Sequence, residues 1–173
     1  GPSFDTIVAF NENSAIPHYK TGDTVLKYNS VILIDFGCKV EGYCSDTTRT
    51  FFYGNEPNSE FINRYNAVLT AHNLALNSIT NGTLGVDAHN VAVNHLKTAN
   101  LSEYFTHGLG HGVGVKIHEM PRLSKNSDSV LTSGNCFSIE PGVYFENEYG
   151  IPIINKRISV TPIAMLVAAS GGD

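Results

Sequence analysis

The chain has 173 residues, a length typical of one domain with its own hydrophobic core. Hydrophobic residues make up 42% of the sequence and charged residues 16%, which is typical of folded proteins and excludes a disordered class. The formal net charge is −5 without a basic block, so binding to nucleic acid through its phosphates is disfavoured. The longest apolar run, 163–169, is too short to cross a bilayer, and we expect neither a membrane protein nor a secreted one.

The cysteines Cys38, Cys44 and Cys136 are odd in number and form no Cys-x-x-Cys pair. A disulfide framework is therefore disfavoured, and reduced thiols in a cytoplasmic protein are expected. We expect a single domain over 1–173. The chain opens directly into a strand-like segment, which is compatible with a fragment of a longer protein.

The first part of the chain is predicted to form strands. The segment from Thr6 begins as a strand and becomes polar before Pro17. Residues 31–34 are a continuous apolar run, typical of a strand buried on both faces, and the run ends at Asp35. Residues 42–52 are rich in β-branched and aromatic side chains and predict a further strand.

The middle of the chain is predicted to be helical. Apolar residues recur at helical spacing over 60–79, and Gly82 follows as a stop signal. Asp87 is predicted to cap a second helix. The glycine-rich segment 107–114 is predicted to be a loop. Strands are predicted after it, over 136–140, 143–145 and 151–154. This order predicts an α+β fold with a largely antiparallel sheet.

Two aspartates lie where the first strands are predicted. Asp35 ends an apolar strand, and Asp46 lies eleven residues later, within the next predicted strand. The two side chains can face each other across a hairpin. A carboxylate at the end of a buried strand is costly unless it is paired or metal-bound. Aspartate is also common in turns and caps, so this pair alone leaves both interpretations open.

Histidines and glycines alternate from His107 to Gly114, and His118 follows. Glycines let the backbone approach a ligand closely, and imidazole is the commonest metal ligand. Three histidines within twelve residues of a loop are hard to explain by core packing. Glu140 ends an apolar strand before Pro-Gly; on its own it is typical of a surface residue at a strand end.

These clusters together form an oxygen-rich set of candidate ligands with one nitrogen: Asp35, Asp46, His111 and Glu140. Such a set suits Mn, Co, Fe or Zn acting on a bound water, and differs from an all-thiolate structural zinc site. The remaining histidines on the predicted helices are expected to be structural or solvent-facing: His72, His89 and His95.

The motifs resemble the catalytic domain of the proline-specific metallopeptidases, aminopeptidase P and prolidase, in the pita-bread family that includes methionine aminopeptidase. They occur in order: Ser3-Phe4-Asp5-Thr6-Ile7-Val8-Ala9, Pro17-His18-Tyr19, Asp35-x-Gly37, Ser45-Asp46-x-Thr48-Arg49-Thr50, His107-Gly-Leu-Gly-His111-Gly-x-Gly114, His118-Glu119-x-Pro121 and Ile139-Glu140-Pro141-Gly142-x-Tyr144. The Asp-x-Thr-Arg-Thr form is similar to the proline-specific branch. The resemblance implies a pita-bread fold: a curved, mainly antiparallel sheet with helices on one face, with elements on the N-terminal side missing here.

The resemblance also implies a metal centre. Asp35 would bind one ion, Asp46 would bridge two, and His111 and Glu140 would bind the second. Manganese is the expected metal, with cobalt or zinc as alternatives.

The implied reaction is hydrolysis of the bond that precedes proline at a peptide N-terminus, by water activated between two cations. Glu140 would handle the proton, and His118 would stabilise the developing oxyanion. The expected partner is a peptide with proline in second position, and the resemblance favours a homo-oligomer. The histidines that match family residues contacting the substrate and the transition state are His18, His107 and His118, and the resemblance gives His107 a catalytic role beside Glu140 and His118.

The segment 150–173 departs from the family pattern. The family carries a bridging glutamate in a Gly-x-Arg-x-Glu-Asp strand soon after the Glu-Pro-Gly motif. Aligned from its glycine, the arginine position holds Pro152 and the glutamate position holds Ile154. An alignment anchored downstream places Asn155 at the glutamate position. Neither alignment provides a carboxylate.

We therefore expect one ion to be held well, by Asp46, His111 and Glu140. The second, left with Asp35 and a share of Asp46, is expected to bind weakly or not at all, which would lower or abolish peptidase activity. The alternative is a pita-bread domain that binds peptide or protein without cutting it. A metal-free hydrolase similar to creatinase is disfavoured, because clustered acids without a cation would repel one another.

Overall fold

The structure, a computed structural model, describes residues 1–153 and 155–158. Its N-terminal part forms a three-stranded antiparallel sheet in the order β1-β2-β5, within the described residues. The strands are β1 (Ile7–Phe10), β2 (Ser30–Phe36) and β5 (Thr47–Tyr53). A short 3-10 helix (Asn11–Ala15) follows β1, and a small hairpin of β3 (Lys39–Val40) and β4 (Tyr43–Cys44) precedes β5.

The apolar run of β2 alternates in burial. Val31 and Leu33 are buried, whereas Ile32 and Ile34 are only half-buried. The prediction of a strand buried on both faces is therefore wrong for the second face. The strand belongs to an antiparallel sheet, in which one face packs on the core and the other can remain more open.

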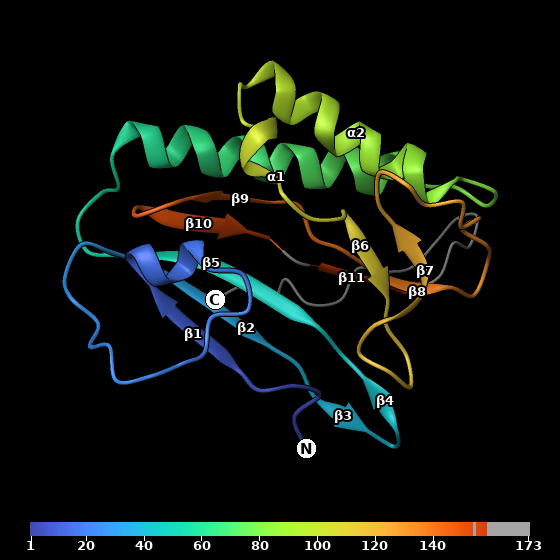
Figure 1. The fold of residues 1–173 in the computed structure, drawn as a ribbon, viewed down its shortest axis with the longest axis horizontal. Coiled ribbons are helices and arrows are strands. Elements are labelled where there is room, and N and C mark those ends of the chain that lie inside the picture. The colour runs from blue at the N-terminus through green and yellow to red at the C-terminus, as the bar shows by residue number, and fades with distance from the viewer. Residues whose placement is uncertain (154, 159–173) are drawn as a thin grey trace, which may run out of the picture.

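The α-helices of the described residues, α1 (Ser59–Ser78) and α2 (Gly85–Thr98), pack together on one side of the strands (Figure 1). The side chain of Asn58 caps α1 by accepting the amide hydrogen of Phe61 at 2.8 Å. The prediction that Asp87 caps α2 is wrong: Asp87 lies in the first turn, where its charge suits the helix dipole. Neither helix is long and apolar enough to cross a membrane.

The strands that follow the helices lie beneath the helix layer (Figure 1). In the described residues they form a four-stranded antiparallel sheet, β11-β8-β6-β7, and a β9–β10 hairpin. The predicted strands are confirmed as β8, β9 and β10, the last shifted toward Tyr149, while residue 154 lies outside the described residues. Their bounds are β6 (Gly110–Gly112), β7 (Glu119–Leu123), β8 (Cys136–Ile139), β9 (Gly142–Phe145), β10 (Tyr149–Pro152) and β11 (Asn155–Ile158).

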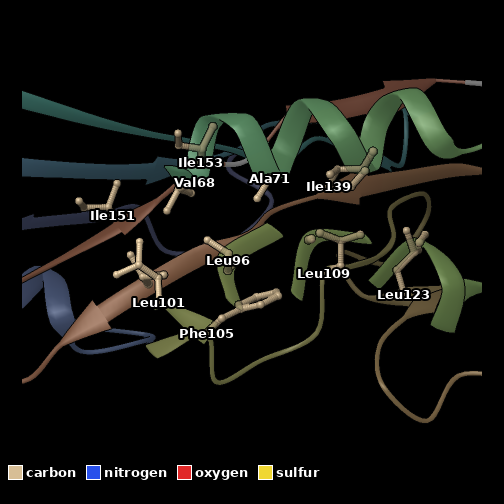
Figure 2. Packing of buried hydrophobic residues seen from close by; sticks show 14 of the residues in the cluster. Val68, Ala71, Leu96, Leu101, Phe105, Leu109, Leu123, Ile139, Ile151 and Ile153 are labelled. Carbon is tan, nitrogen blue, oxygen red and sulfur yellow. The ribbon is translucent and has the colours of Figure 1, made fainter. Parts of the chain in front are cut away.

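The hydrophobic core lies between the helices and the sheets. Its fully buried members come from both layers (Figure 2), and they include Val68 and Ala71 of α1, Leu96 of α2, Ile139 of β8 and Ile151 of β10. Burying a side chain as large as leucine stabilises the fold by about 1.5–3 kcal/mol. The core therefore holds β8 firmly, and with it the end of the strand where Glu140 follows.

Strand β6 approaches β8 closely because position 110 has no side chain. A methyl group built on Gly110 would overlap the carbonyl oxygen of Ser138. The amide of Glu140 donates to the carbonyl of Leu109 at 2.7 Å, which fixes the relative position of the two strands. This close approach places His111 of β6 beside the end of β8.

We predict that Gly110→Ala destabilises the fold by about 1–3 kcal/mol, because the added methyl forces β6 away from β8. Gly22→Ala is the matched control, since the nearest atom to its added methyl lies at 3.9 Å, an ordinary contact. Denaturant unfolding of the parent and both variants measures the difference. Equal free energies of unfolding for the parent and Gly110→Ala would contradict the close contact.

His72 and His89 are buried, as a structural role requires. The Nε2 atom of His72 has no hydrogen-bond partner among the described residues, and 2% of the residue is exposed. Burial lowers the pKa of His72, because the charged imidazolium loses its hydration.

This burial predicts acid sensitivity. The unfolded chain takes up a proton on His72 near its ordinary pKa of 6.5, whereas the folded chain does so only at lower pH. The contribution of neutral His72 to the free energy of unfolding is therefore complete above pH 6.5 and is lost progressively below it. The loss is about 1.4 kcal/mol per pH unit for each proton that only the unfolded chain binds. We predict that His72→Gln flattens the dependence of unfolding free energy on pH in this range. An unchanged slope would contradict the assignment.

Candidate metal centre

A cavity of about 890 Å³ opens among the N-terminal segment, β2, β6 and the end of β8. Residues far apart in the sequence line it. They include every site residue predicted from the sequence: His18, Asp35, Asp46, His107, His111, His118 and Glu140.

Three of these side chains converge. Asp46, His111 and Glu140 each offer one ligand atom, and these atoms lie within 4.8 Å of one another. His111 Nε2 lies 3.1 Å from Glu140 Oε1 and 3.6 Å from Asp46 Oδ2. Asp46 and His111 are buried and Glu140 is half-buried. Two carboxylates and one imidazole form a donor set that suits Mn, Fe, Co or Zn, so the residues fit a divalent cation.

The local structure around two members of the trio differs from the prediction. Asp46 lies in the break between β4 and β5, not inside a strand. His111 lies in β6, where the sequence predicts a loop. Glycine in a strand is unfavourable on its own, but it allows another backbone to approach closely, as Ser138 does here.

The imidazole of His111 is fixed in orientation. Its Nδ1 lies 3.0 Å from the carbonyl oxygen of Gly112, which can only accept, so Nδ1 carries a hydrogen and Nε2 faces the carboxylates. Burial opposes protonation of the ring, but the hydrogen bond and charge of Glu140, with the charge of Asp46, raise the pKa of His111. A divalent cation would compete with that proton for Nε2.

Asp35 lines the same cavity from β2, but among the described residues it does not belong to the close trio. Its ladder partner is Thr48, and Asp46 lies two residues earlier, before β5, so the two aspartates are not ladder partners but line the same cavity. Thr48 Oγ1 donates to Asp35 Oδ1 at 2.7 Å. Burial raises the pKa of Asp35; the Thr48 hydrogen bond opposes this shift, and the charge of Glu140 adds to it.

His107 is held by Tyr144. His107 Nδ1 lies 2.7 Å from the carbonyl oxygen of Gly108 and therefore carries the hydrogen, so Nε2 accepts from the Tyr144 hydroxyl at 3.2 Å. Burial raises the pKa of Tyr144, as do the charges of Glu140 and Asp35, so its hydroxyl stays protonated. Sequence reasoning assigned Tyr144 no role, although the same motif carries Glu140.

The other two histidines lie at the exposed side of the cavity. The ring of His118 packs edge-on against that of His111, with centroids 4.3 Å apart. Partial burial and the charge of His111 lower the pKa of His118, so it is neutral near pH 7. His18 has a positive φ of 60°, at a turn that follows the 3-10 helix.

The segment that departs from the family pattern is described only in part. Pro152 lines the cavity, and its carbonyl accepts from Thr50 Oγ1 at 2.8 Å. Ile154, the side chain of Asn155 and residues 159–173 lie outside the described part of the chain. Glu148, on the β9–β10 turn, is bound to Arg64 at 2.6 Å.

Comparisons with known proteins identify a family and several relatives. The model of Metallopeptidase family M24 matches residues 1–162. The Xaa-Pro dipeptidase of Lactobacillus delbrueckii subsp. lactis is 39% identical over 151 residues, which cover 87% of this chain and 41% of that protein.

Two solved structures extend the comparison. The crystal structure of X-Pro aminopeptidase from Thermotoga maritima matches with a TM-score of 0.88 and 40% identity, over 92% of this chain and 44% of that one. The X-prolyl aminopeptidase of Caenorhabditis elegans, described as a cytosolic enzyme with a di-nuclear active site, matches with a TM-score of 0.84 and 35% identity, over 95% and 28% of the two chains.

The chain therefore spans less than half the length of these relatives. The neighbours confirm the pita-bread fold that the motifs imply. Since the family model covers nearly the whole sequence, the chain belongs to metallopeptidase family M24.

Proposed function

We propose that this chain carries the active centre of a metal-dependent peptidase that cleaves the bond preceding proline at a peptide N-terminus. The observation that carries the proposal is the trio of Asp46, His111 and Glu140 inside a large cavity. The names of the relatives, an Xaa-Pro dipeptidase and an X-Pro aminopeptidase, support the substrate class. The cavity volume of about 890 Å³ is sufficient for a short peptide.

Asp46, His111 and Glu140 would hold a divalent cation, for which we propose manganese, with cobalt or zinc as alternatives. When bound, such a cation polarises a carbonyl and lowers the pKa of water. Glu140 is half-buried at the cavity wall and can accept a proton there. His118, neutral near pH 7, can donate an N–H to a developing oxyanion.

The remaining histidines would bind the substrate. His107 keeps a fixed orientation through Gly108 and Tyr144, which suits a residue that must meet the substrate in one geometry. His18 lies on the exposed side of the cavity, where a peptide would enter. A cytosolic location follows the description of the Caenorhabditis elegans relative, and assembly with further copies follows the resemblance.

We further propose that one cation binds tightly and a second, toward Asp35, weakly. Asp35 stands outside the close trio of the described residues. The positions aligned with the family glutamate, Ile154 or Asn155, carry no carboxylate in the sequence. The di-nuclear site named for the Caenorhabditis elegans relative is the arrangement from which this chain would differ.

We predict that the chain loaded with Mn²⁺ releases the first residue from an Ala-Pro peptide and not from its Ala-Ala counterpart, and that chelation stops the reaction. Glu140→Gln should lower kcat by about 100-fold or more, because it removes a ligand and the proton acceptor. Glu56→Gln is the matched control, since Glu56 is exposed on a loop before α1. Product chromatography measures the rates.

Metal-independent cleavage, or full activity in Glu140→Gln, would contradict the mechanism. Saturable binding of the Ala-Pro peptide without cleavage by the loaded parent would contradict the peptidase and favour the binding module.

We predict that Mn²⁺ titration followed by removal of loosely bound ion leaves one ion per chain. Asp46→Asn should abolish this binding, whereas Asp35→Asn should leave it intact, because Asp35 is not part of the close trio. Elemental analysis counts the ions. Two retained ions would contradict the weak second site, and would mean that another group replaces the missing carboxylate.

A further inference from the structure

The hydroxyl group of Ser138 lies between two of the proposed ligands. Ser138 belongs to β8 and is fully buried, with 0% exposure. Its Oγ accepts the amide hydrogen of His111 at 3.0 Å. The same Oγ lies 3.1 Å from Glu140 Oε1 and 3.3 Å from the carbonyl oxygen of His111. The hydroxyl therefore contacts the main chain of one proposed ligand and the side chain of the other.

A serine hydroxyl has one hydrogen, so it can fully serve only one of these two acceptors. Glu140 Oε1 is the closer acceptor and belongs to a carboxylate, which makes the stronger, charge-assisted bond. Accepting an amide hydrogen while donating to a carboxylate also polarises the hydroxyl in one direction, which strengthens both bonds. The resulting chain of bonds runs from the His111 amide through Ser138 to Glu140.

The position of this hydroxyl depends on how β6 and β8 pack. The amide of Glu140 donates to the carbonyl of Leu109, as in a regular antiparallel ladder. The amide of His111, in contrast, donates to the side-chain hydroxyl of Ser138. Gly110 permits this, because any side chain there would overlap the carbonyl of Ser138. The hydroxyl thus joins the two strands at the level of the site.

We propose that Ser138 is a positioning residue for the cation site, an inference that rests on the proposed function. Its hydroxyl fixes Glu140 Oε1 on the side of His111 and keeps both ligands aimed at one point. Without it, the half-buried carboxylate of Glu140 can rotate away from the site. Ser138 itself is not a ligand, because its oxygen is engaged by the His111 amide and its hydrogen by Glu140.

A second carboxylate that lines the cavity is held by a buried hydroxyl in the same way. Thr48 is buried, with 1% exposure, and its hydroxyl donates to Asp35 Oδ1 at 2.7 Å. Each of these two carboxylates is therefore held by a hydroxyl that comes from the protein interior. Groups that orient metal ligands in this way commonly change metal affinity by about 10–100-fold when they are removed.

The test compares Ser138→Ala with a matched control, Ser14→Ala. Ser14 is buried to a similar degree, with 1% exposure. Its hydroxyl also accepts an amide hydrogen, from Gly150 at 2.9 Å, and donates to a carbonyl, that of Asn11 at 2.6 Å. Within the described residues Ser14 does not line the cavity. The two substitutions remove the same group from equally buried places, and only one of them is at the site.

The dissociation constant for Mn²⁺, measured on the full chain by electron paramagnetic resonance of the free ion, is the readout. Ser138→Ala should raise it by about 10–100-fold. Ser14→Ala should leave it unchanged, and Ser138→Thr, which keeps the hydroxyl, should restore most of the affinity. The visible spectrum of the Co²⁺-loaded chain should change in Ser138→Ala and not in Ser14→Ala. Thermal unfolding without metal establishes that each variant is folded.

The proposal would be overturned by parental Mn²⁺ affinity in Ser138→Ala, or by equal weakening in Ser138→Ala and Ser14→Ala. In both cases the metal site of the proposed function would stand. A parent chain that binds no Mn²⁺ would overturn the proposed function and this inference together. If Ser138→Ala does not fold, Ser138→Cys keeps the shape with a weaker donor, and parental affinity there would equally overturn the proposal.

Discussion

The centre of this molecule depends on burying two carboxylates beside one imidazole. Removing such charges from water is costly unless each meets an opposite charge or a hydrogen-bond donor. His111 meets this need, because its Nδ1 is committed to the carbonyl of Gly112 and its Nε2 faces Glu140 and Asp46. The interruption between β4 and β5 places Asp46 at the site, and the close approach of β6 to β8 brings His111 and Glu140 together. The surrounding core holds β8 and the helices in the positions that it requires.

The fold could be predicted where apolar residues follow the spacing of a helix or a strand. It could not be predicted where a contact between segments distant in sequence determines the structure. Apolar spacing predicts α1, and apolar runs predict β2 and β8. The segment 107–114 is predicted to be a loop because glycine has low strand propensity. It nevertheless contains β6, because the absence of a side chain at Gly110 lets this strand lie close to Ser138 of β8. That reason lies in a strand distant in sequence.

The chemistry of the site could be predicted better than its geometry. Histidines and carboxylates are few, so Asp46, His111 and Glu140 stand out in a sequence and share a cavity in the structure. The geometry depends on the strand register, which the sequence does not reveal. In the β2–β5 ladder Asp35 pairs with Thr48, and Asp46 precedes the first residue of β5. The supporting hydroxyls could not be found, because serine and threonine are common and what they bind depends on which strand lies alongside.

The three members of the trio are widely separated along the chain: Asp46 precedes both helices, and His111 and Glu140 follow them. A cation bound by all three would act as a cross-link between the N-terminal and C-terminal sheets, and its binding free energy would add to that of folding. At a free ion concentration about 100 times Kd, this linkage is worth about 2.7 kcal/mol. Metal supply would then govern what fraction of the chains is folded, as well as whether they can react.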